Sequence, residues 1–567
     1  MNRAIGIAVV VLLLLACSKR SADAPPSLTA PSYATVPSPP GQPIGVLPTP
    51  VGPLPLTAAE RQELYHLPEG GEILPLDMLR AVESIKTFKP FMEGLERFRL
   101  VPDPHDPDGL PIGMSVDRAD GKRIEPTRVF FNCAACHSAQ ITYGGRSLFI
   151  EGAPAHADIA GFIVELLGSL ESTVTDAKKL SAFLSRLAAL RQHKDLAAAY
   201  PDLALHKDTA DGTLMAQVQK LIHKEKSKAA AVVEQKMARI DSAAAALSLL
   251  KEKIVYLQRL RGLRTTTFAG FGRLDAFMAA RNLLFGDKTA VDVNSPVSLP
   301  PIFGVSKLTW FHYDNNTTSQ LQRNIGEDLG MGAVADMQTG RSSVKLRNLL
   351  RLEELAARLP VPRWPEALLG TLDAARISRG EPIYQQQCAG CHEPASDGMF
   401  PDRRVALDVI GTDPNRAVNF AAKLGDRPFV DALAEALALV QKAAAADEGI
   451  SPEELAKASR GPVTWRAEKA YSSRPIAGVW ATAPYLHNGS VPTLYDLLLP
   501  PTQRPKTFLT GSREYLPAKV GYRYDGSHGG EFLFDTEKDG NHSSGHTYGT
   551  TLTEEQRLDL LEYLKSR

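Results

Sequence analysis

FNCAACH, at residues 131–137, and CAGCH, at residues 388–392, share the pattern Cys-x-x-Cys-His. This pattern is the attachment site of a c-type haem. The two thiols add to the vinyl groups on one edge of the porphyrin, and the histidine that follows becomes the proximal ligand of the iron. Two copies therefore predict two covalently bound haems. The predicted attachment residues are Cys133, Cys136 and His137 for haem one, and Cys388, Cys391 and His392 for haem two.

Two other kinds of site also use Cys-x-x-Cys. One is the thioredoxin-like redox pair, and the other is half of a zinc site. A zinc site would need a second pair of thiolates, and neither kind requires a histidine directly after each pair. The repeated Cys-His ending favours haem attachment over both.

Composition and charge narrow the classes of function. The chain has 567 residues, of which 44% are hydrophobic and 23% charged, as in ordinary globular proteins. That length is enough for two or three domains. Lys plus Arg and Asp plus Glu both number 64, so the formal net charge is zero. Nothing in this balance indicates a nucleic acid or an acidic partner.

The chain has five cysteines, and the two haem motifs use four of them. No pair remains for a structural disulfide, so covalent haem must supply part of the cross-linking. The fifth cysteine, Cys17, closes a short apolar run that follows Arg3. This run is too short for a permanent membrane span and resembles a bacterial lipoprotein signal, with cleavage before a lipidated Cys17. The alternative is a plain secretory signal with an incidental cysteine.

Residues 18–56 are rich in Pro, Ser, Ala and Thr, with almost no charge after Asp23. Such a segment is typical of an extended tether. Ser18, rather than Asp, follows the lipidated cysteine, and by resemblance to the sorting rule of Gram-negative lipoproteins this implies the outer membrane. We therefore predict a signal peptide at 1–17, a tether at 18–56, and a periplasmic or cell-surface enzyme anchored to the membrane by lipid.

The first folded part, 57–345, is predicted to be one haem domain. A capping box, Thr57 to Glu60, should begin its first helix, and another helix is expected around 77–98. From about 155 to 265 helix-forming residues dominate, and 213–261 lacks Gly and Pro. We interpret about 166–265 as a helical insertion beside the first haem. Its three histidines lie among charges and are poor candidates for iron ligands: His193, His206 and His223.

The second part, 346–567, is predicted to be a cytochrome c-like domain. Gly380, Tyr384 and Cys388 stand four apart, so they share one helical face that leads into the second haem motif. Its partner should be the last helix, which Thr553 and Gln556 cap. A further helix is expected near 426–446. The expected fold class is mainly α: two cytochrome c-like haem domains with a helical insertion and long ordered loops.

The ligand opposite each proximal histidine decides whether a haem relays electrons or binds a small molecule. Cytochrome c domains often supply a methionine from the C-terminal side, but the last methionine here is Met399. Histidine is the remaining choice for haem two. We place His546 first and His487 second, the latter as a partner of a haem propionate. The other histidines on this side are His528 and His542.

For haem one, no Met or His stands in a context that demands ligation, so its second face is expected to be open. Between the motifs, residues 266–345 are rich in loops and aromatic side chains. Core packing is the usual role of such rings, but an apolar substrate pocket needs them as well. The densest aromatic patch includes Phe303, Trp310 and Phe311.

The chain resembles the bacterial dihaem cytochrome c peroxidase superfamily. The residues that carry this resemblance are TAPYLHNGS at 482–490 and PTL at 492–494, together with the two haem motifs. Within it the chain is similar to the rubber-oxygenase-like branch, through RPI at 474–476, Trp480, LLLPP at 497–501, Gly545-His546 and RNIG at 323–326. The resemblance covers the chain from about 85 to the end, except for the insertion.

This resemblance implies an oxidative enzyme. Peroxidases of the superfamily carry Phe-Trp-Asp-Gly-Arg after the first haem, but FHYDN stands at 311–315 here, without the Gly-Arg. Rubber oxygenases bind O₂ at the first haem, beside bulky apolar residues, and cleave carbon–carbon double bonds. The resemblance implies that Phe303, Trp310 and Phe311 are such residues and act beside haem one. We therefore expect haem one to use O₂ on an unsaturated apolar substrate while haem two relays electrons. The alternatives are a peroxidase fed by a small redox cytochrome, and a non-catalytic electron carrier.

Overall fold

The computed structural model describes residues 44–46, 56–71, 73–117, 128–190, 243–260, 265–286, 289–458, 461–527 and 531–567. All of them belong to one compact unit, Pro37–Arg567. The predicted signal peptide with Cys17, and most of the predicted tether, lie outside the described residues. So do His193, His206, His223 and His528.

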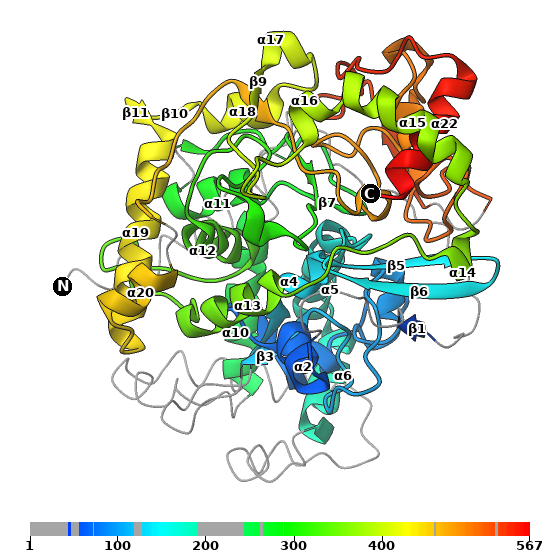
Figure 1. Ribbon diagram of the computed structural model, residues 1–567. Coiled ribbons are helices and arrows are strands. Elements are labelled where there is room, and N and C mark those ends of the chain that lie inside the picture. Colours follow the sequence, from blue (N-terminus) through cyan, green and yellow to red (C-terminus); the bar gives the residue numbers. More distant parts are fainter. Residues whose placement is uncertain are drawn as a thin grey trace, which may run out of the picture. The chain divides into compact units, whose positions relative to one another are not determined.

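A small antiparallel sheet positions the first haem motif (Figure 1). Its strand order is β2 (Leu74–Pro75), β4 (Arg128–Phe131) and β3 (Met114–Asp117). Strand β4 runs directly into α4 (Cys133–Cys136), where the Asn132 side chain accepts a hydrogen bond from the Ala134 N–H at 3.0 Å. The motif therefore begins as a capped helical turn at the end of a strand.

The chain leaves the motif through a second sheet, in which β6 (Arg146–Glu151) lies between β5 (Ser138–Tyr143) and β1 (Ile44–Val46). Helix α2 (Ala58–His66) packs against α4. The Thr57 and Glu60 capping box is present, which confirms that prediction. Gly113, just before β3, lies directly against α4. Its φ is 88°, and a Cβ there would lie 2.1 Å from the Ala135 nitrogen.

The single helix expected around 77–98 is wrong. The structure has a short α3 (Leu76–Ala81) and a 3₁₀ turn, η2 (Leu95–Phe98). Between them the Ser84 hydroxyl accepts hydrogen bonds from the N–H groups of Lys86 and Thr87, and Phe88 has a φ of 55°. A serine side chain that binds nearby backbone competes with the helical hydrogen bonds, which ends the helix.

Three helices form the described part of the predicted insertion: α5 (Ile159–Thr175), α6 (Ala177–Leu190) and α10 (Ala243–Leu260). Helix α5 packs against both of the others. Leucines at helical spacing, such as Leu166, Leu170, Leu250 and Leu257, are fully buried in their shared core. The helical character predicted for this region is confirmed where the structure describes it.

Helix α12 (Gln320–Met331) packs against three other long helices: α11 (Ala276–Phe285), α13 (Leu346–Ala357) and α19 (Phe429–Asp447). Helix α19 confirms the helix expected near 426–446. Helix α12 is unusual because several of its polar residues are buried, among them Gln322, Arg323, Asn324 and Asp328. Burial of polar groups is costly unless they have partners, so this helix points to a functional cavity.

The second haem motif has the helix pair predicted for a cytochrome c domain. Helix α15 (Ala374–Gln387) leads into α16 (Ala389–His392) and packs against α22 (Glu554–Lys565) (Figure 1). A Cβ on Gly380 would lie 2.1 Å from the Asp559 carbonyl oxygen, so the helices cross at that glycine. The Thr553 and Gln556 capping box is present as predicted.

Shorter elements complete the described chain. The strands are β7 (Arg273–Leu274), β8 (Val297–Ser298), β9 (Arg404–Ala406), β10 (Lys423–Leu424), β11 (Arg427–Pro428), β12 (Ala470–Ser472), β13 (Thr507–Thr510) and β14 (Phe532–Asp535). The helices are α14 (Glu366–Leu369), α17 (Leu407–Ile410), α18 (Asn415–Phe420), α20 (Pro452–Ala458) and α21 (Leu494–Leu497), with 3₁₀ turns η5 (Val305–Lys307), η6 (Val479–Ala481) and η7 (Pro501–Gln503).

The fold class is a mixture of helices and short strands, so the expectation of a mainly α chain is met only in part. In the described part of the chain, six sheets of two or three strands accompany the helices. The core that surrounds both motifs includes Leu64 and Phe149 as well as Tyr384 and Leu560. It therefore draws on both sides of the predicted boundary at 345/346, which stays a prediction. No helix within the described ranges is both long and apolar enough to span a bilayer.

Candidate functional site

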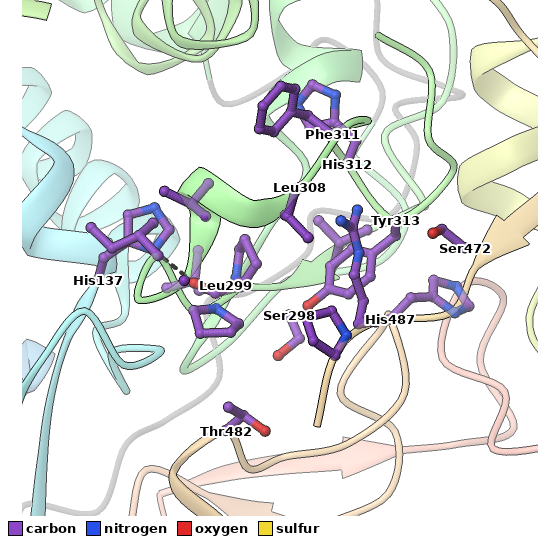
Figure 2. Close-up of a pocket in the computed structure, with 18 of the residues that line it drawn as sticks. His137, Ser298, Leu299, Leu308, Phe311, His312, Tyr313, Ser472, Thr482 and His487 are labelled. Carbon is purple, nitrogen blue, oxygen red and sulfur yellow. Dashed lines mark hydrogen bonds between the residues drawn. The ribbon is translucent and has the colours of Figure 1, made fainter. Parts of the chain in front are cut away.

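Both haem motifs line one cavity of about 440 Å³. Its wall contains residues from β4, α4, α12, α13, α15 and the loops around 297–313 and 472–487. Figure 2 shows His137 on one side of this cavity, Phe311 and His312 on another, and Tyr313 near His487. The residues of the two motifs are thus brought into a common space.

His137 is oriented by a single backbone hydrogen bond. Its Nδ1–H donates to the Pro300 carbonyl oxygen at 2.8 Å, the dashed line in Figure 2. Burial lowers the pKa of His137 to about 4, so the imidazole is neutral and the lone pair of Nε2 is free. Histidines that bind metals usually donate their other N–H to a carbonyl or carboxylate. This arrangement fits a proximal iron ligand.

The same arrangement recurs in the second motif. The Nδ1–H of His392 donates to the Arg474 carbonyl oxygen at 2.6 Å. The ring centre of His546 lies 6.4 Å from that of His392, with 56° between the ring planes. Two imidazoles that share a metal ion, each about 2 Å from it, have ring centres roughly 6 Å apart. The spacing therefore fits one iron held between His392 and His546.

The loop of His546 is anchored closely. The φ angles of Gly545 and His546 are 69° and 44°, and a Cβ on Gly545 would lie 2.2 Å from the Gly411 carbonyl carbon. The His546 N–H donates to the Ile410 carbonyl oxygen at 2.8 Å. The buried Arg504 guanidinium donates to the carbonyl oxygens of Ser543, Gly545 and His546. These contacts hold the imidazole toward the cavity.

The other two described histidines of the C-terminal side, His487 and His542, have different neighbours. The His487 ring lines the cavity and stacks on Tyr471, with ring centres 4.0 Å apart. Burial lowers its pKa to about 3. Its role toward a haem propionate stays a prediction. His542 pairs with Asp413 at 2.7 Å, is half-exposed, and lies outside the cavity wall.

The three aromatic residues expected beside haem one are not on one wall. Phe303 and Phe311 are buried and line the cavity. Trp310 does not, because its ring faces the Arg466 guanidinium at 3.4 Å from the ring centre. Arg466 in turn is held by Asp402 at 2.6 Å. Of these two neighbours in the sequence, Trp310 therefore packs against a charged group and Phe311 faces the cavity.

Buried cations also line the cavity. The Arg323 Nε atom is buried and has no hydrogen-bond partner among the described residues. Arg474 is partly buried, and desolvation lowers its pKa to about 10. Among the described residues its guanidinium donates a long 3.5 Å hydrogen bond to the Trp310 carbonyl oxygen. Haem carries two propionate carboxylates, and an arginine with free hydrogen-bond donors can form charge-assisted hydrogen bonds with them. The donor set therefore fits the cofactor that the motifs imply.

Sequence reasoning missed a polar group in this cavity. His312 and Glu327 both line it, with the His312 Nε2 atom 3.4 Å from Glu327 Oε1. Burial alone would raise the pKa of Glu327, but Arg323 and His312 hold it at about 2. The available signal was the spacing of Arg323 and Glu327, which stand four apart and so share one face of a helix.

Residues 470–509 match the family model described as RoxA-like, cytochrome c-like. This segment contains the TAPYLHNGS motif and Arg474, whose carbonyl oxygen orients His392. A cytochrome c-like domain implies a covalently bound c-type haem and, in general terms, haem oxidoreductase activity.

Two proteins from Sinorhizobium fredii (strain NBRC 101917 / NGR234) are similar to this chain. Uncharacterized protein y4iJ is 29% identical over 90% of this chain and 91% of its own length. Uncharacterized protein y4iM is 32% identical over 47% of this chain and 64% of its own length. Their names state no activity. The similarity to y4iJ extends over most of this chain but indicates no reaction.

Proposed function

We propose that this chain is a dihaem c-type oxidoreductase in which the two haems have different tasks. Haem one, on Cys133, Cys136 and His137, binds the oxidant. Haem two, between His392 and His546, relays electrons. The observation that carries the proposal is an asymmetry: His392 faces a second imidazole at 6.4 Å, whereas within the described residues His137 has no facing imidazole of this kind.

The residues of the chain prepare the site for such chemistry. A bound c-type haem supplies the redox-active iron and, where one face is open, a place for O₂ or peroxide. The Pro300 carbonyl oxygen holds the tautomer of His137. Arg323 and Arg474 offer their guanidinium groups to the haem carboxylates. The rings of Phe303 and Phe311 line the cavity and make its wall apolar, which disfavours water there.

We further propose that the oxidant is O₂ and that the substrate is an unsaturated apolar molecule. Much of the wall between the motifs is apolar, and the residues concerned are Leu299, Ile302, Phe303, Val305, Leu308 and Phe311. A wall of this kind favours a hydrocarbon over a polar substrate. The resemblance to rubber oxygenases and the match to a RoxA-like model support the same reading.

The second candidate is a peroxidase that takes electrons from a small redox cytochrome. The observation that favours it is the His312 and Glu327 pair in the cavity, because peroxide chemistry needs a group that moves protons. In either case we propose a lipid-anchored protein at the bacterial outer membrane, with a small-molecule oxidant and no nucleic-acid partner.

Carbon monoxide and oxygen uptake test the proposal together. The reduced holoprotein should bind CO at one of its two haems, because the other iron is closed by two histidines. Oxygen should be consumed when a polyisoprenoid or another unsaturated hydrocarbon is added, with little turnover of hydrogen peroxide by a reduced cytochrome. CO binding at neither haem would support the electron-carrier reading. Fast peroxide turnover without oxygen uptake would support the peroxidase.

Phe311→Ala provides a sharper version of this test, with Trp310→Ala as the matched control. Phe311 lines the cavity, but Trp310 lies under Arg466. We expect the first change to lower oxygenation while both haems stay attached, and the second to have the smaller effect. The reverse order would show that the oxidised substrate does not lie in this cavity.

A further inference from the structure

A tight turn at residues 84–89, called here the Phe88 turn, presents an aromatic ring to solvent. The Ser84 N–H donates to the Lys89 carbonyl oxygen at 2.9 Å, and the Phe88 N–H donates to the Ser84 carbonyl oxygen at 3.0 Å. Phe88 is 70% exposed, the largest exposed fraction of any large hydrophobic side chain in the described part of the chain. The turn does not line the haem cavity.

The backbone of Phe88 has a conformation that its side chain disfavours. Its φ is 55°, in the left-handed region where a bulky residue is an outlier. Such strain costs stability, and a ring that points outward recovers little of it by packing inside the chain. Glycine would form the same turn without this strain. The strain and the exposure together point to a contact of the ring with something outside the chain.

The helix beneath the turn holds it in place. The Ser84 hydroxyl donates to the Glu165 carboxylate at 2.7 Å, and the Ile85 N–H donates to the Ser169 hydroxyl at 3.1 Å. Glu165 and Ser169 are both buried and stand four apart on α5, so they lie on one face of that helix. Because the turn is fixed at two neighbouring points, the ring is kept outward.

Lysines surround the exposed ring. Lys86 and Lys89 flank Phe88 in the turn, and both are exposed. Lys178, near the start of α6, is exposed as well, and the Lys179 Nζ atom lies 5.9 Å from the centre of the Phe88 ring. An aromatic ring and several ammonium groups therefore share one part of the surface.

The acids of this region are engaged by other groups. Glu83 faces the Arg186 guanidinium at 3.7 Å, and Glu165 accepts from Arg97 at 2.8 Å. Asp176 caps α6 by accepting from two backbone N–H groups of its first turn. The charge around the ring is therefore positive on balance.

We propose that the Phe88 turn is a contact site for an anionic phospholipid surface. The Phe88 ring enters the boundary between headgroups and acyl chains, and the lysines stay at the level of the phosphates. Basic and aromatic side chains together bind such a surface through buried apolar area and electrostatic attraction. A pure hydrocarbon surface would offer these lysines no anionic partner. The inference rests neither on the proposed haem chemistry nor on the proposed lipid at Cys17.

Vesicle binding of the holoprotein tests this contact. The parent protein is the Cys17→Ala variant, so that lipid on this residue does not contribute. At low salt it should co-sediment with vesicles of phosphatidylglycerol and phosphatidylcholine, and much less with phosphatidylcholine alone. Adding Phe88→Gly should lower the partition coefficient roughly tenfold, because the buried area of one ring is lost. Adding Lys89→Glu should lower it roughly fivefold or more, because one attractive charge is lost and a repulsive one is gained.

Two further variants separate the ring from the backbone. Phe88→Trp should keep the binding of the parent, because an indole ring also favours the membrane interface. Leu533→Ala is the matched control, since Leu533 on β14 is 57% exposed but has no place in the Phe88 turn. It should also keep the binding of the parent. An unchanged haem absorption spectrum shows that each variant is folded.

Equal partition of the parent and Phe88→Gly would overturn the inference. So would equal binding to neutral and anionic vesicles, or no binding by the parent. If Phe88→Gly keeps its vesicle binding but no longer adsorbs to polyisoprene particles, the turn contacts an apolar substrate and the membrane assignment is wrong.

Discussion

At the scale of single residues, the proposed role of haem two rests on one histidine. His546 faces His392 across 6.4 Å, whereas His487 stacks on Tyr471. A bis-histidine iron is low-spin and closed to added ligands. The stacking of His487 on Tyr471 places it in the cavity wall.

His546→Gly should open the second iron. Glycine removes the imidazole and accepts the positive φ of this position without strain. We expect a high-spin signal at one haem in electron paramagnetic resonance, with the other haem unchanged, and recovery of the low-spin signal when imidazole is added. If His487→Ala produces this change and His546→Gly does not, the two roles are reversed.

Cys17 tests the proposed lipid anchor. Cys17→Ala should release the protein from the membrane fraction without changing its haem content, because a lipidated cysteine would supply more than the two hydrophobic signals that stable anchoring needs. Ultracentrifugation in high salt, followed by haem staining of pellet and supernatant, measures the result. A variant that still sediments with membranes would contradict the lipoprotein proposal.

At the scale of elements, the crossing of α15 and α22 presents the second haem motif. Gly380 is the contact point, and Arg379 reinforces it through an ion pair with Asp559 at 2.8 Å. The two helices cannot approach as closely if a side chain intervenes. The position of Cys388 at the end of α15 therefore depends on a residue eight positions earlier.

Gly380→Ala should destabilise the holoprotein. Its methyl group would meet the Asp559 carbonyl oxygen at 2.1 Å, and overpacking of a core contact costs about 1–3 kcal/mol. Gly390→Ala is the control, since nothing lies within 4 Å of a Cβ there. Urea unfolding of the holoproteins, monitored by circular dichroism, measures the difference. Equal midpoints for the two variants would show that the helices adjust at no cost.

At the scale of the whole molecule, the two haem motifs share a core. Cys133 and Cys388 both pack against the cluster that contains Tyr384, Trp480 and Leu560. A core common to two cofactor sites couples their stability, because neither half can lose its packing alone.

Unfolding should therefore be cooperative across both haems. The loss of CO-binding haem one, the loss of the low-spin haem two and the loss of helical circular dichroism should have the same midpoint in denaturant. Replacing both haem-two cysteines by alanine should also lower the midpoint of the haem-one signal. Two separated transitions would instead support independent domains that meet near residues 345/346.

The sequence by itself determined the features that a few neighbouring residues encode. The two Cys-x-x-Cys-His motifs, the capping boxes at Thr57 and Thr553, and the α15 and α22 pair follow from local spacing. The absence of methionine after Met399 also pointed to histidine for haem two. The one helix that was predicted wrongly, around 77–98, also has a local cause. The Ser84 hydroxyl accepts hydrogen bonds from nearby backbone N–H groups in place of helical carbonyls.

Only the tertiary structure decided which distant residues meet. It brings His546 opposite His392, which is 154 positions earlier in the chain, turns Trp310 under Arg466, and leaves Phe311 in the cavity. It also joins His312 to Glu327 through a strained loop and a buried helix face. Such contacts depend on how whole elements pack, and packing is set by many residues at once, so no short pattern encodes them.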